Sequence, residues 1–229
     1  DALKARYGDD IALYLLGHSW GGLLGTAALL QDGVQDEVAG WIEVDGAHDV
    51  PLLNTYAVPM LISQGEVELE AGNNTETWTE IVEFAEGVDT DQLTAEDSLL
   101  INQYAYEAEA LIDAVTFDEG LSLLELAGYA LVSQESPLTA LWTGGLTNLQ
   151  LDLEVEQTSL TTKLSRIDVP TLLLWGTYDF VVPPGLGEDA LARIPDSRLV
   201  MLETSGHSPM FNQPDEFADS ILAFINETR

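Results

Sequence analysis

Cysteine is absent from this sequence of 229 residues, and basic residues are few. Without cysteine the chain has no disulfides, no thiolate metal site and no cysteine nucleophile, and its redox compartment stays open. Only 7 Lys and Arg stand against 40 Asp and Glu, which gives a formal net charge of -33. Nucleic acids and anionic membranes bind clustered Lys and Arg, so the sequence argues against both kinds of partner.

Long apolar runs are also missing. None approaches the roughly 20 residues that cross a bilayer, and no basic segment followed by an apolar core stands at the N-terminus. We therefore expect the chain as given to be soluble, with no signal peptide and no transmembrane segment. Its 46% of hydrophobic residues is enough to bury the core of one domain that carries an inserted lid.

The excess of carboxylates predicts adaptation to salt. Self-repulsion on this scale weakens a fold in dilute buffer, whereas at about 1 M salt the Debye length falls to about 3 Å and the penalty largely vanishes. A halophilic protein and an ordinary acidic protein both fit this composition.

Apolar runs and helical patterns alternate along the chain in the manner of an α/β protein. A short helix is expected to close near Gly8. Strands are expected at residues 11–17, 39–45, 169–175 and 197–202, and helices at residues 20–31, 186–193 and 214–226. Strands that alternate with helices form a mostly parallel sheet.

Residues 50–167 interrupt this alternation with helical patterns and no convincing strand. Helices are expected at residues 75–86, 94–115 and 121–134, and Thr94 with Asp97 resembles a capping box. The chain is therefore expected to consist of a core, residues 1–49 and 168–229, and a helical insertion, residues 50–167.

A candidate nucleophile lies in Gly17-His18-Ser19-Trp20-Gly21. This segment matches G-x-S-x-G, a tight strand-to-helix turn that lifts a serine hydroxyl above the sheet edge. It follows a buried strand and precedes a helix, a setting that few chance matches satisfy. Gly17 and Gly21 are expected where the turn leaves little room for a Cβ. Ser19 is therefore the candidate nucleophile.

A serine nucleophile needs a histidine base and a carboxylate that orients it. The chain has three histidines. His207 lies in a loop between the last strand and the last helix, where the base belongs in this architecture. His18 is expected to be a structural partner inside the fold. His48 follows the second strand, and we expect it in a solvated loop, with a place in the lining of a pocket as the alternative.

The candidate acid is Asp179, which follows the apolar strand that ends in Trp175-Gly176. Parallel α/β sheets place their sites at the carboxyl ends of strands. Asp45, at the end of the preceding strand, is the alternative acid. The order Ser19, Asp179, His207 is also the chain order of the α/β-hydrolase triad.

On these residues the chain resembles the α/β-hydrolase superfamily, in the branch with a helical cap between the sixth and seventh strands. The matching pieces are the segment from Gly17 to Gly22, Gly176-Thr177-Tyr178-Asp179 with Val182-Pro183, and Ser205-Gly206-His207. The resemblance implies that residues 1–49 are hydrolase core with the nucleophile elbow, residues 50–167 a cap, and residues 168–229 the core with the acid and the histidine. The visible strands would be the fifth to the eighth of eight.

The resemblance also identifies what is missing. The first four strands are not found, nor is the upstream loop that supplies one backbone N–H of the oxyanion hole; the N–H of Trp20 would be the other. The loss of one such donor typically costs about a hundredfold to a thousandfold in rate. We therefore expect the sequence to be a fragment of a longer reading frame, or a second chain to supply the rest.

Serine at the elbow does not match haloalkane dehalogenases or epoxide hydrolases, whose nucleophile is Asp. The residues indicate a serine esterase that hydrolyses a small carboxylic ester through an acyl-enzyme, without a cofactor. Cleavage of an amide by an aminopeptidase of the proline-iminopeptidase type is the first alternative, because similar elbows with Trp after the serine occur there. A non-catalytic binding protein that kept the fold is the second.

Two further expectations concern the surroundings of the site. The aromatic residues of the insertion are candidates for an acyl or leaving-group pocket, although a role in the cap core is the better expectation for each: Trp78, Tyr104, Tyr106, Phe117 and Trp142. A metal site is not expected, because the three histidines are separated and form no H-x-x-x-H pair. In low salt the negative field favours neutral or cationic substrates.

Overall fold

The computed structural model describes residues 2–8, 10–112, 115 and 157–229. Within them four strands form one parallel sheet in the order β1-β2-β3-β4. The strands are β1 (Tyr14–His18), β2 (Gly40–Val44), β3 (Thr171–Gly176) and β4 (Ser197–Leu202). Although the long insertion separates β2 from β3 in the sequence, they are neighbours in the sheet, with Trp41 opposite Thr171.

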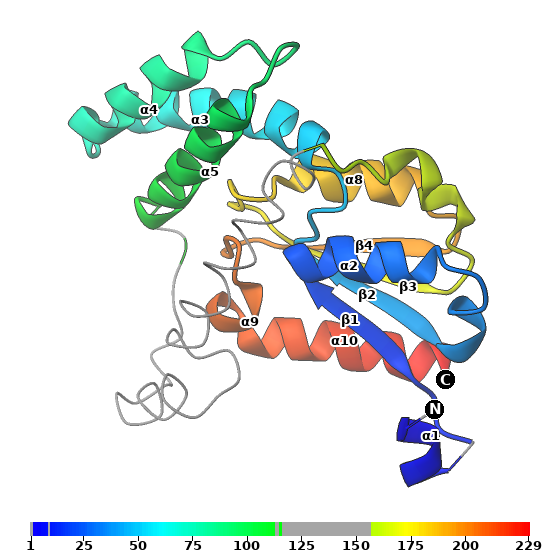
Figure 1. Cartoon of the computed structure of the whole chain (residues 1–229). Coiled ribbons are helices and arrows are strands. Elements are labelled where there is room, and N and C mark those ends of the chain that lie inside the picture. The colour runs from blue at the N-terminus through cyan, green and yellow to red at the C-terminus, as the bar shows by residue number, and fades with distance from the viewer. Residues whose placement is uncertain (1, 9, 113–114, 116–156) are drawn as a thin grey trace.

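Helices cover both faces of this sheet. Figure 1 shows α2 (Trp20–Leu29) and α8 (Pro184–Arg193) on one face and α10 (Pro214–Thr228) on the other. The remaining elements outside the insertion are α1 (Ala2–Tyr7), the 3-10 helix η1 (Gln35–Glu37) and the short α9 (Pro209–Asn212). The chain therefore forms a parallel sheet between two layers of helices, the arrangement that the resemblance in the sequence implies.

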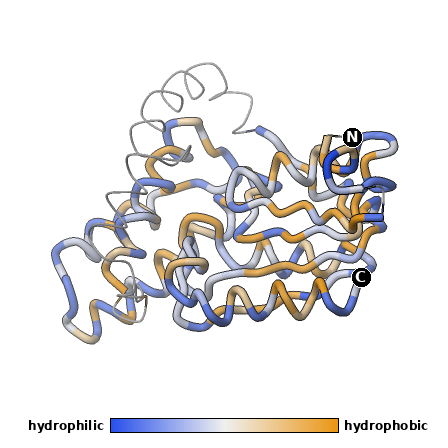
Figure 2. The backbone as a smooth tube through the Cα atoms, turned by 90° about the horizontal axis from the view of Figure 1, so that it is seen from below, coloured by the Kyte–Doolittle hydropathy of each residue, from blue (hydrophilic) through white to orange (hydrophobic). Residues whose placement is uncertain are grey.

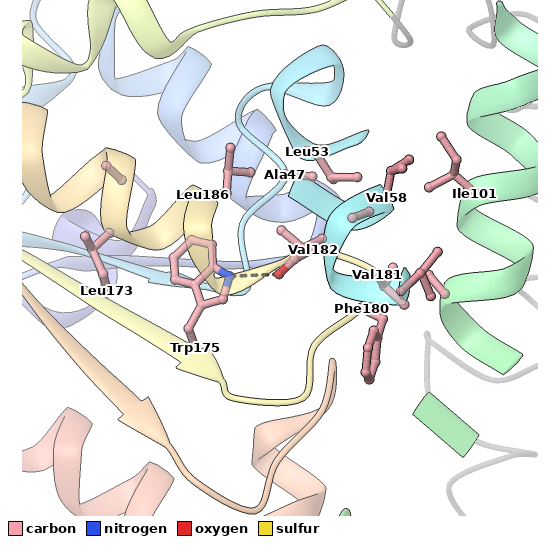
Figure 3. Packing of buried hydrophobic residues seen from close by; sticks show 14 of the residues in the cluster. Ala47, Leu53, Val58, Ile101, Leu173, Trp175, Phe180, Val181, Val182 and Leu186 are labelled. Carbon is pink, nitrogen blue, oxygen red and sulfur yellow. Dashed lines mark hydrogen bonds between the residues drawn. The ribbon is translucent and has the colours of Figure 1, made fainter. Parts of the chain in front are cut away.

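The central strands are apolar because each is covered on both faces. All residues of β2 and β3 are buried. Successive side chains point to opposite faces of a strand, so β3 sends Leu173 and Trp175 into the core beneath α8, and Leu172 and Leu174 into the core against Phe224 of α10. Figure 3 shows Trp175 in the larger of these cores. Figure 2 shows the same distribution, with hydrophobic residues along the strands and hydrophilic residues at the outer loops.

The described part of residues 50–167 contains helices and no strand. These helices are α3 (Val50–Ala71), α4 (Thr75–Gly87), α5 (Ala95–Ala110) and the 3-10 helix η2 (Thr161–Arg166). Figure 1 shows α3, α4 and α5 together beyond the carboxyl ends of the strands. Asp49 caps α3 by accepting from the backbone N–H of Leu52 at 2.9 Å. The domain boundaries themselves stay predictions.

Most predicted elements agree with the structure to within a few residues. The capping box of Thr94 and Asp97 is present at the start of α5. The first strand begins at Tyr14, three residues later than expected, and α5 ends five residues earlier than expected, at Ala110. The helix predicted at residues 121–134 lies outside the described residues.

Candidate active site

A strained turn between β1 and α2 presents Ser19. The strand ends at His18 and the helix begins at Trp20, so Ser19 alone makes the turn, with φ at 56°. A positive φ is uncommon for a residue with a side chain and is often found at functional sites. The carbonyl oxygen of Ser19 accepts from the N–H groups of Gly22 at 2.9 Å and Ala47 at 3.0 Å, which fixes the turn.

The glycines of the turn were predicted only in part. A Cβ on Gly17 would lie less than 3.0 Å from the backbone of Gly21, as expected of a tight turn. The prediction for Gly21 was wrong, since a Cβ there would meet no atom within 4 Å. The close approach is instead at Gly22, whose Cβ would lie less than 3.0 Å from the Cα of Gly46. The turn thus packs on the loop after β2 one residue later than expected.

The predicted nucleophile, base and acid lie in one chain of hydrogen bonds. Nε2 of His207 is 2.9 Å from Oγ of Ser19, and Nδ1 of His207 is 2.8 Å from Oδ2 of Asp179. Asp179 is fully buried and His207 is 5% exposed. The three residues come from the segments that follow β1, β3 and β4, so the parallel sheet brings them together at the carboxyl ends of its strands.

The loop after β3 holds Asp179 in place. Oδ1 of Asp179 accepts from the backbone N–H of Val182 at 2.7 Å. The indole N–H of Trp175 donates to the carbonyl oxygen of the same Val182 at 2.9 Å, a bond drawn in Figure 3. The orientation of the acid is therefore anchored in the hydrophobic core.

Asp45, the alternative acid, lies near Asp179, and it is Asp179 that hydrogen-bonds to the ring of His207. Asp45 is fully buried, and its φ of 43° is again positive. Its N–H donates to the carbonyl oxygen of Leu174 and its Oδ1 accepts from the N–H of Gly176, both at 2.9 Å. Burial and the neighbouring charge of Asp179 raise the pKa of Asp45 well above its ordinary value. Burial likewise raises the pKa of Asp179, against the opposing effect of the Val182 N–H.

Burial favours the neutral form of the His207 imidazole. Burial lowers the pKa of His207 below its ordinary value of 6.5, although the charges of Asp45 and Glu109 act in the opposite direction. A neutral ring that donates from Nδ1 to Asp179 has its Nε2 lone pair directed to the hydroxyl of Ser19. In this state the imidazole can accept the hydroxyl proton.

The other two histidines are both structural neighbours of the site. Nε2 of His18 is 2.7 Å from the carbonyl oxygen of His207, and the two rings are 4.8 Å apart, which agrees with the expected structural role. The expectation of a solvated loop for His48 was wrong. His48 is fully buried, and its Nδ1 is 2.8 Å from Oε1 of the buried Glu43. A glutamate within a strand buried on both faces needs such a partner, and this was the signal in the sequence.

Sequence reasoning missed the contact between α5 and the histidine loop. Oε2 of Glu109 accepts from the backbone N–H of His207 at 2.9 Å, and the ring of Tyr106 stands edge-on to the imidazole at 6.2 Å. A Cβ on Gly206 would lie less than 3.0 Å from the Glu109 carboxyl carbon, so the carboxyl group packs directly on this loop. Burial raises the pKa of Glu109. Residues three apart share one helix face, but nothing in the sequence indicated what that face covers.

The predicted pocket aromatics have different positions. Trp78 is fully buried in the core, as expected for a structural residue. Tyr104 stacks on Phe84 at 4.6 Å, whereas Tyr106 is 52% exposed beside His207. Phe117 and Trp142 lie outside the described residues. Tyr106 is therefore the member of the set that the structure places next to the predicted base.

Two other features bear on the chemistry of the site. Trp20 is the first residue of α2, so its N–H lies at the helix N-terminus, outside the intrahelical hydrogen bonds. His18, Asp45 and His207 each bring one ligand-type atom within 4.8 Å of the others. Both ring nitrogens of His207 already contact Ser19 and Asp179, so the arrangement suits proton transfer better than metal binding. None of the described helices has the length and apolarity that a membrane span requires.

Comparison with known proteins gives the family and the fold. A model of the alpha/beta hydrolase family matches residues 1–220. Pimeloyl-[acyl-carrier protein] methyl ester esterase of Neisseria meningitidis is 42% identical over 62 residues, which are 27% of this chain and 24% of that protein. The alignment thus covers about a quarter of the length of this curated relative.

Solved structures resemble nearly the whole chain at low identity. Proline iminopeptidase of Mycobacterium smegmatis has a TM-score of 0.64 and 18% identity, with 99% of this chain and 69% of that chain covered. An esterase from Exiguobacterium antarcticum has a TM-score of 0.56 and 18% identity, with 98% and 70% covered. At this identity the likeness establishes the fold.

Proposed function

Because the chain belongs to the alpha/beta hydrolase family, we propose that it is a serine hydrolase that cleaves a small carboxylic ester through an acyl-enzyme. The observation that carries the proposal is the hydrogen-bonded series of Ser19, His207 and Asp179, with contacts of 2.9 and 2.8 Å. The ester-hydrolysing name of the Neisseria relative supports an ester as the substrate.

In the proposed reaction Oγ of Ser19 attacks the ester carbonyl carbon while Nε2 of His207 accepts the hydroxyl proton. Asp179 stabilises the imidazolium through its bond to Nδ1. His207 then gives the proton to the leaving alcohol oxygen, and a water molecule hydrolyses the acyl-enzyme by the same steps in reverse order. The N–H of Trp20 is assigned to the oxyanion that forms at the carbonyl oxygen.

The residues around the site support a narrower proposal for the substrate. In the proposal residues 50–167 form a cap over the core made of residues 1–49 and 168–229. Glu109 and Tyr106 lie beside His207, so an acidic group and an aromatic ring border the reacting groups. A neutral or cationic ester suits this border, since the chain is strongly negative overall. The same charge supports the proposal that the protein is adapted to high salt.

Amide cleavage of the proline-iminopeptidase type is the second candidate, favoured by the TM-score of 0.64 with such an enzyme. A panel of p-nitrophenyl esters and amino-acid p-nitroanilides, assayed at low and at molar salt, separates the two. Faster turnover of the esters supports the proposal, and turnover confined to the anilides replaces it with the second candidate.

The nucleophile is tested by covalent labelling with a fluorophosphonate probe. We expect the wild type to be labelled and the Ser19→Ala variant not to be. Ser63→Ala is the matched control, because Ser63 is an exposed serine of α3, and it should be labelled like the wild type. Equal labelling of Ser19→Ala and wild type would contradict the assignment of Ser19, and an unlabelled wild type would favour a non-catalytic binding protein.

A further inference from the structure

Two fully buried carboxyl groups lie side by side at the carboxyl ends of β2 and β3. Asp45 follows β2 and Asp179 follows β3. One carboxyl oxygen of Asp45 lies within 4.8 Å of a ring nitrogen of His207, and Nδ1 of the same ring is 2.8 Å from Oδ2 of Asp179, so the two carboxyl groups are close neighbours. Only Asp179 bonds to the predicted base, so the proposed mechanism gives Asp45 no role.

The two groups differ in the hydrogen-bond donors that they receive. Both oxygens of Asp179 have a donor, namely His207 at Oδ2 and the Val182 N–H at Oδ1. Asp45 receives the Gly176 N–H at Oδ1, whereas its buried Oδ2 has no donor. Two ionised carboxylates cannot hydrogen-bond to each other, but a protonated carboxyl group can donate to a carboxylate. A proton on Oδ2 of Asp45 satisfies both groups.

The charges around the pair favour the same assignment. Five elements bring titratable groups to this region: Asp45 after β2, Asp179 after β3, His207 after β4, His18 at the end of β1 and Glu109 on α5. None of them is a Lys or an Arg. Two adjacent buried carboxylates without a cation repel each other strongly, and one of them then keeps its proton.

We propose that Asp45 is protonated at neutral pH and donates a hydrogen bond to Asp179, so that a pair of carboxyl groups with a single negative charge orients the catalytic base. This inference rests on the proposed function. Asp45 is a positioning residue in it, because it acts on His207 through Asp179. The proton of Asp45 stays on Asp45 throughout the reaction. The hydrogen bond keeps the Asp179 carboxylate ionised and prevents its side chain from rotating.

The strained backbone of Asp45 agrees with this role. Its φ is 43°, and its carboxyl group accepts from the N–H of Gly176, the last residue of β3. Strain of this kind persists only where surrounding contacts maintain it. The Asp45 N–H bond to Leu174 and the Gly176 bond to Oδ1 are the contacts that do so.

Two substitutions at Asp45 test whether its side chain acts as a neutral hydrogen-bond donor or as a second negative charge. Asp45→Ala removes both bonds, and we expect kcat/KM to fall by about 10- to 100-fold, the usual effect of losing a group that orients a ligand or base. Asp45→Asn keeps an oxygen for Gly176 and an N–H donor for Asp179, so it should restore most of this loss. An Asp45→Asn variant as impaired as Asp45→Ala would overturn the proposal.

The pH profile gives a readout that a merely structural role would not change. The acid limb of kcat/KM reports the titration of free His207. If Asp45 is neutral, its replacement by the neutral Asn leaves this limb in place. If Asp45 is ionised, the same replacement removes a neighbouring negative charge, and the limb should move to lower pH by about 1 to 3 units. A shift of this size would refute the proposal.

Infrared difference spectroscopy tests the proton without any reference to activity. At pH 7 the wild type should show the C=O stretch of a protonated carboxyl group that is absent from Asp45→Asn. The matched control is Glu109→Gln, which removes a third carboxyl group near His207, besides those of Asp45 and Asp179, and should leave the band in place. If Asp45→Asn does not fold, the Glu109→Gln spectrum still decides, because a missing band there contradicts a protonated Asp45. Loss of Ser19 labelling with the band retained would instead refute the proposed function alone.

Discussion

Gly21 and Gly22 offer a sharp test of how the nucleophile turn packs. They are adjacent in the first turn of α2, and each can be replaced by Ala. A Cβ on Gly21 would meet no atom within 4 Å, whereas a Cβ on Gly22 would lie less than 3.0 Å from the Cα of Gly46. The structure therefore predicts opposite effects of one substitution at two neighbouring positions.

The magnitudes follow from helix propensity and from overpacking. Gly costs up to about 1 kcal/mol relative to Ala inside a helix, so Gly21→Ala should stabilise the fold by about 0.5 kcal/mol at the helix start. Carbon atoms in contact need about 3.5 to 4.0 Å, and Gly46 has no free space, because its own Cβ would collide with Glu43. Gly22→Ala should therefore destabilise by about 1 to 3 kcal/mol, as overpacked cores do.

The assay is thermal unfolding of both variants and the wild type, followed by circular dichroism in molar NaCl. For a chain of this size 1 kcal/mol corresponds to about 2 to 4 °C, so a difference of about 1.5 to 3.5 kcal/mol between the two variants should separate their Tm values by roughly 3 to 14 °C. Gly22→Ala should also lose activity, because the collision of its Cβ with Gly46 must shift the backbone N–H that holds the carbonyl oxygen of Ser19. If the Tm of Gly22→Ala were equal to or higher than that of Gly21→Ala, this account of the turn would be refuted.

Three further predictions concern salt, pH and the contact with α5. The Tm should rise steeply from about 0.01 to about 1 M NaCl, over which the Debye length falls from about 30 to about 3 Å; a constant Tm would argue for an ordinary acidic protein. Because burial lowers the pKa of His207, the neutral base persists below pH 6.5, and the acid limb of kcat/KM should lie below that value in a pH titration. Glu109→Ala removes the acceptor of the His207 backbone N–H and should lower kcat/KM by about tenfold, as the loss of about 1.4 kcal/mol does. The control is Glu107→Ala, on the exposed side of the same helix, which should have little effect. Equal losses of kcat/KM in both variants would contradict a specific role of Glu109.

The residues of the site were predictable because they follow local rules. G-x-S-x-G fixes a turn by sequence alone, and Asp179 and His207 directly follow strand patterns, which a parallel sheet aligns at one edge. The structure brings those three segments together. The strand ends were less predictable, since pairing determines them: β1 has one partner among the described strands and starts only where that pairing begins, with Tyr14 opposite Gly40.

Contacts between distant elements carried no such local signal. In the sequence, the face of α5 that meets the histidine loop is one turn of a helix with little separation of apolar and polar residues, and its contact with that loop depends on how the insertion folds back. His48 was assigned to a solvated loop because it follows the second strand. The buried position of His48 depends on its contact with Glu43, five residues earlier. The sequence indicates this contact only if a charged residue within a buried strand is assumed to need a polar partner.

The distribution of the carboxyl groups explains how so acidic a chain can build a specific site. Among the described residues the fully or nearly fully buried acids are Glu43, Asp45, Asp49 and Asp179. All four lie in β2 or in the segments that directly follow β2 and β3. Each has a defined partner: His48, the Gly176 N–H, the Leu52 N–H and His207, respectively.

In the part of the chain that the structure describes, the negative charge therefore lies mostly at the surface, whereas the site depends on a few buried acids. The loop after β2 connects these acids to the nucleophile, because Ala47 bonds to the carbonyl oxygen of Ser19 while Asp45 two residues earlier bonds to Gly176. Salt that screens the surface charges leaves these buried contacts almost unchanged, since buried pairs are screened much less than exposed ones. High salt should consequently raise stability while the geometry of the proposed base and acid stays the same.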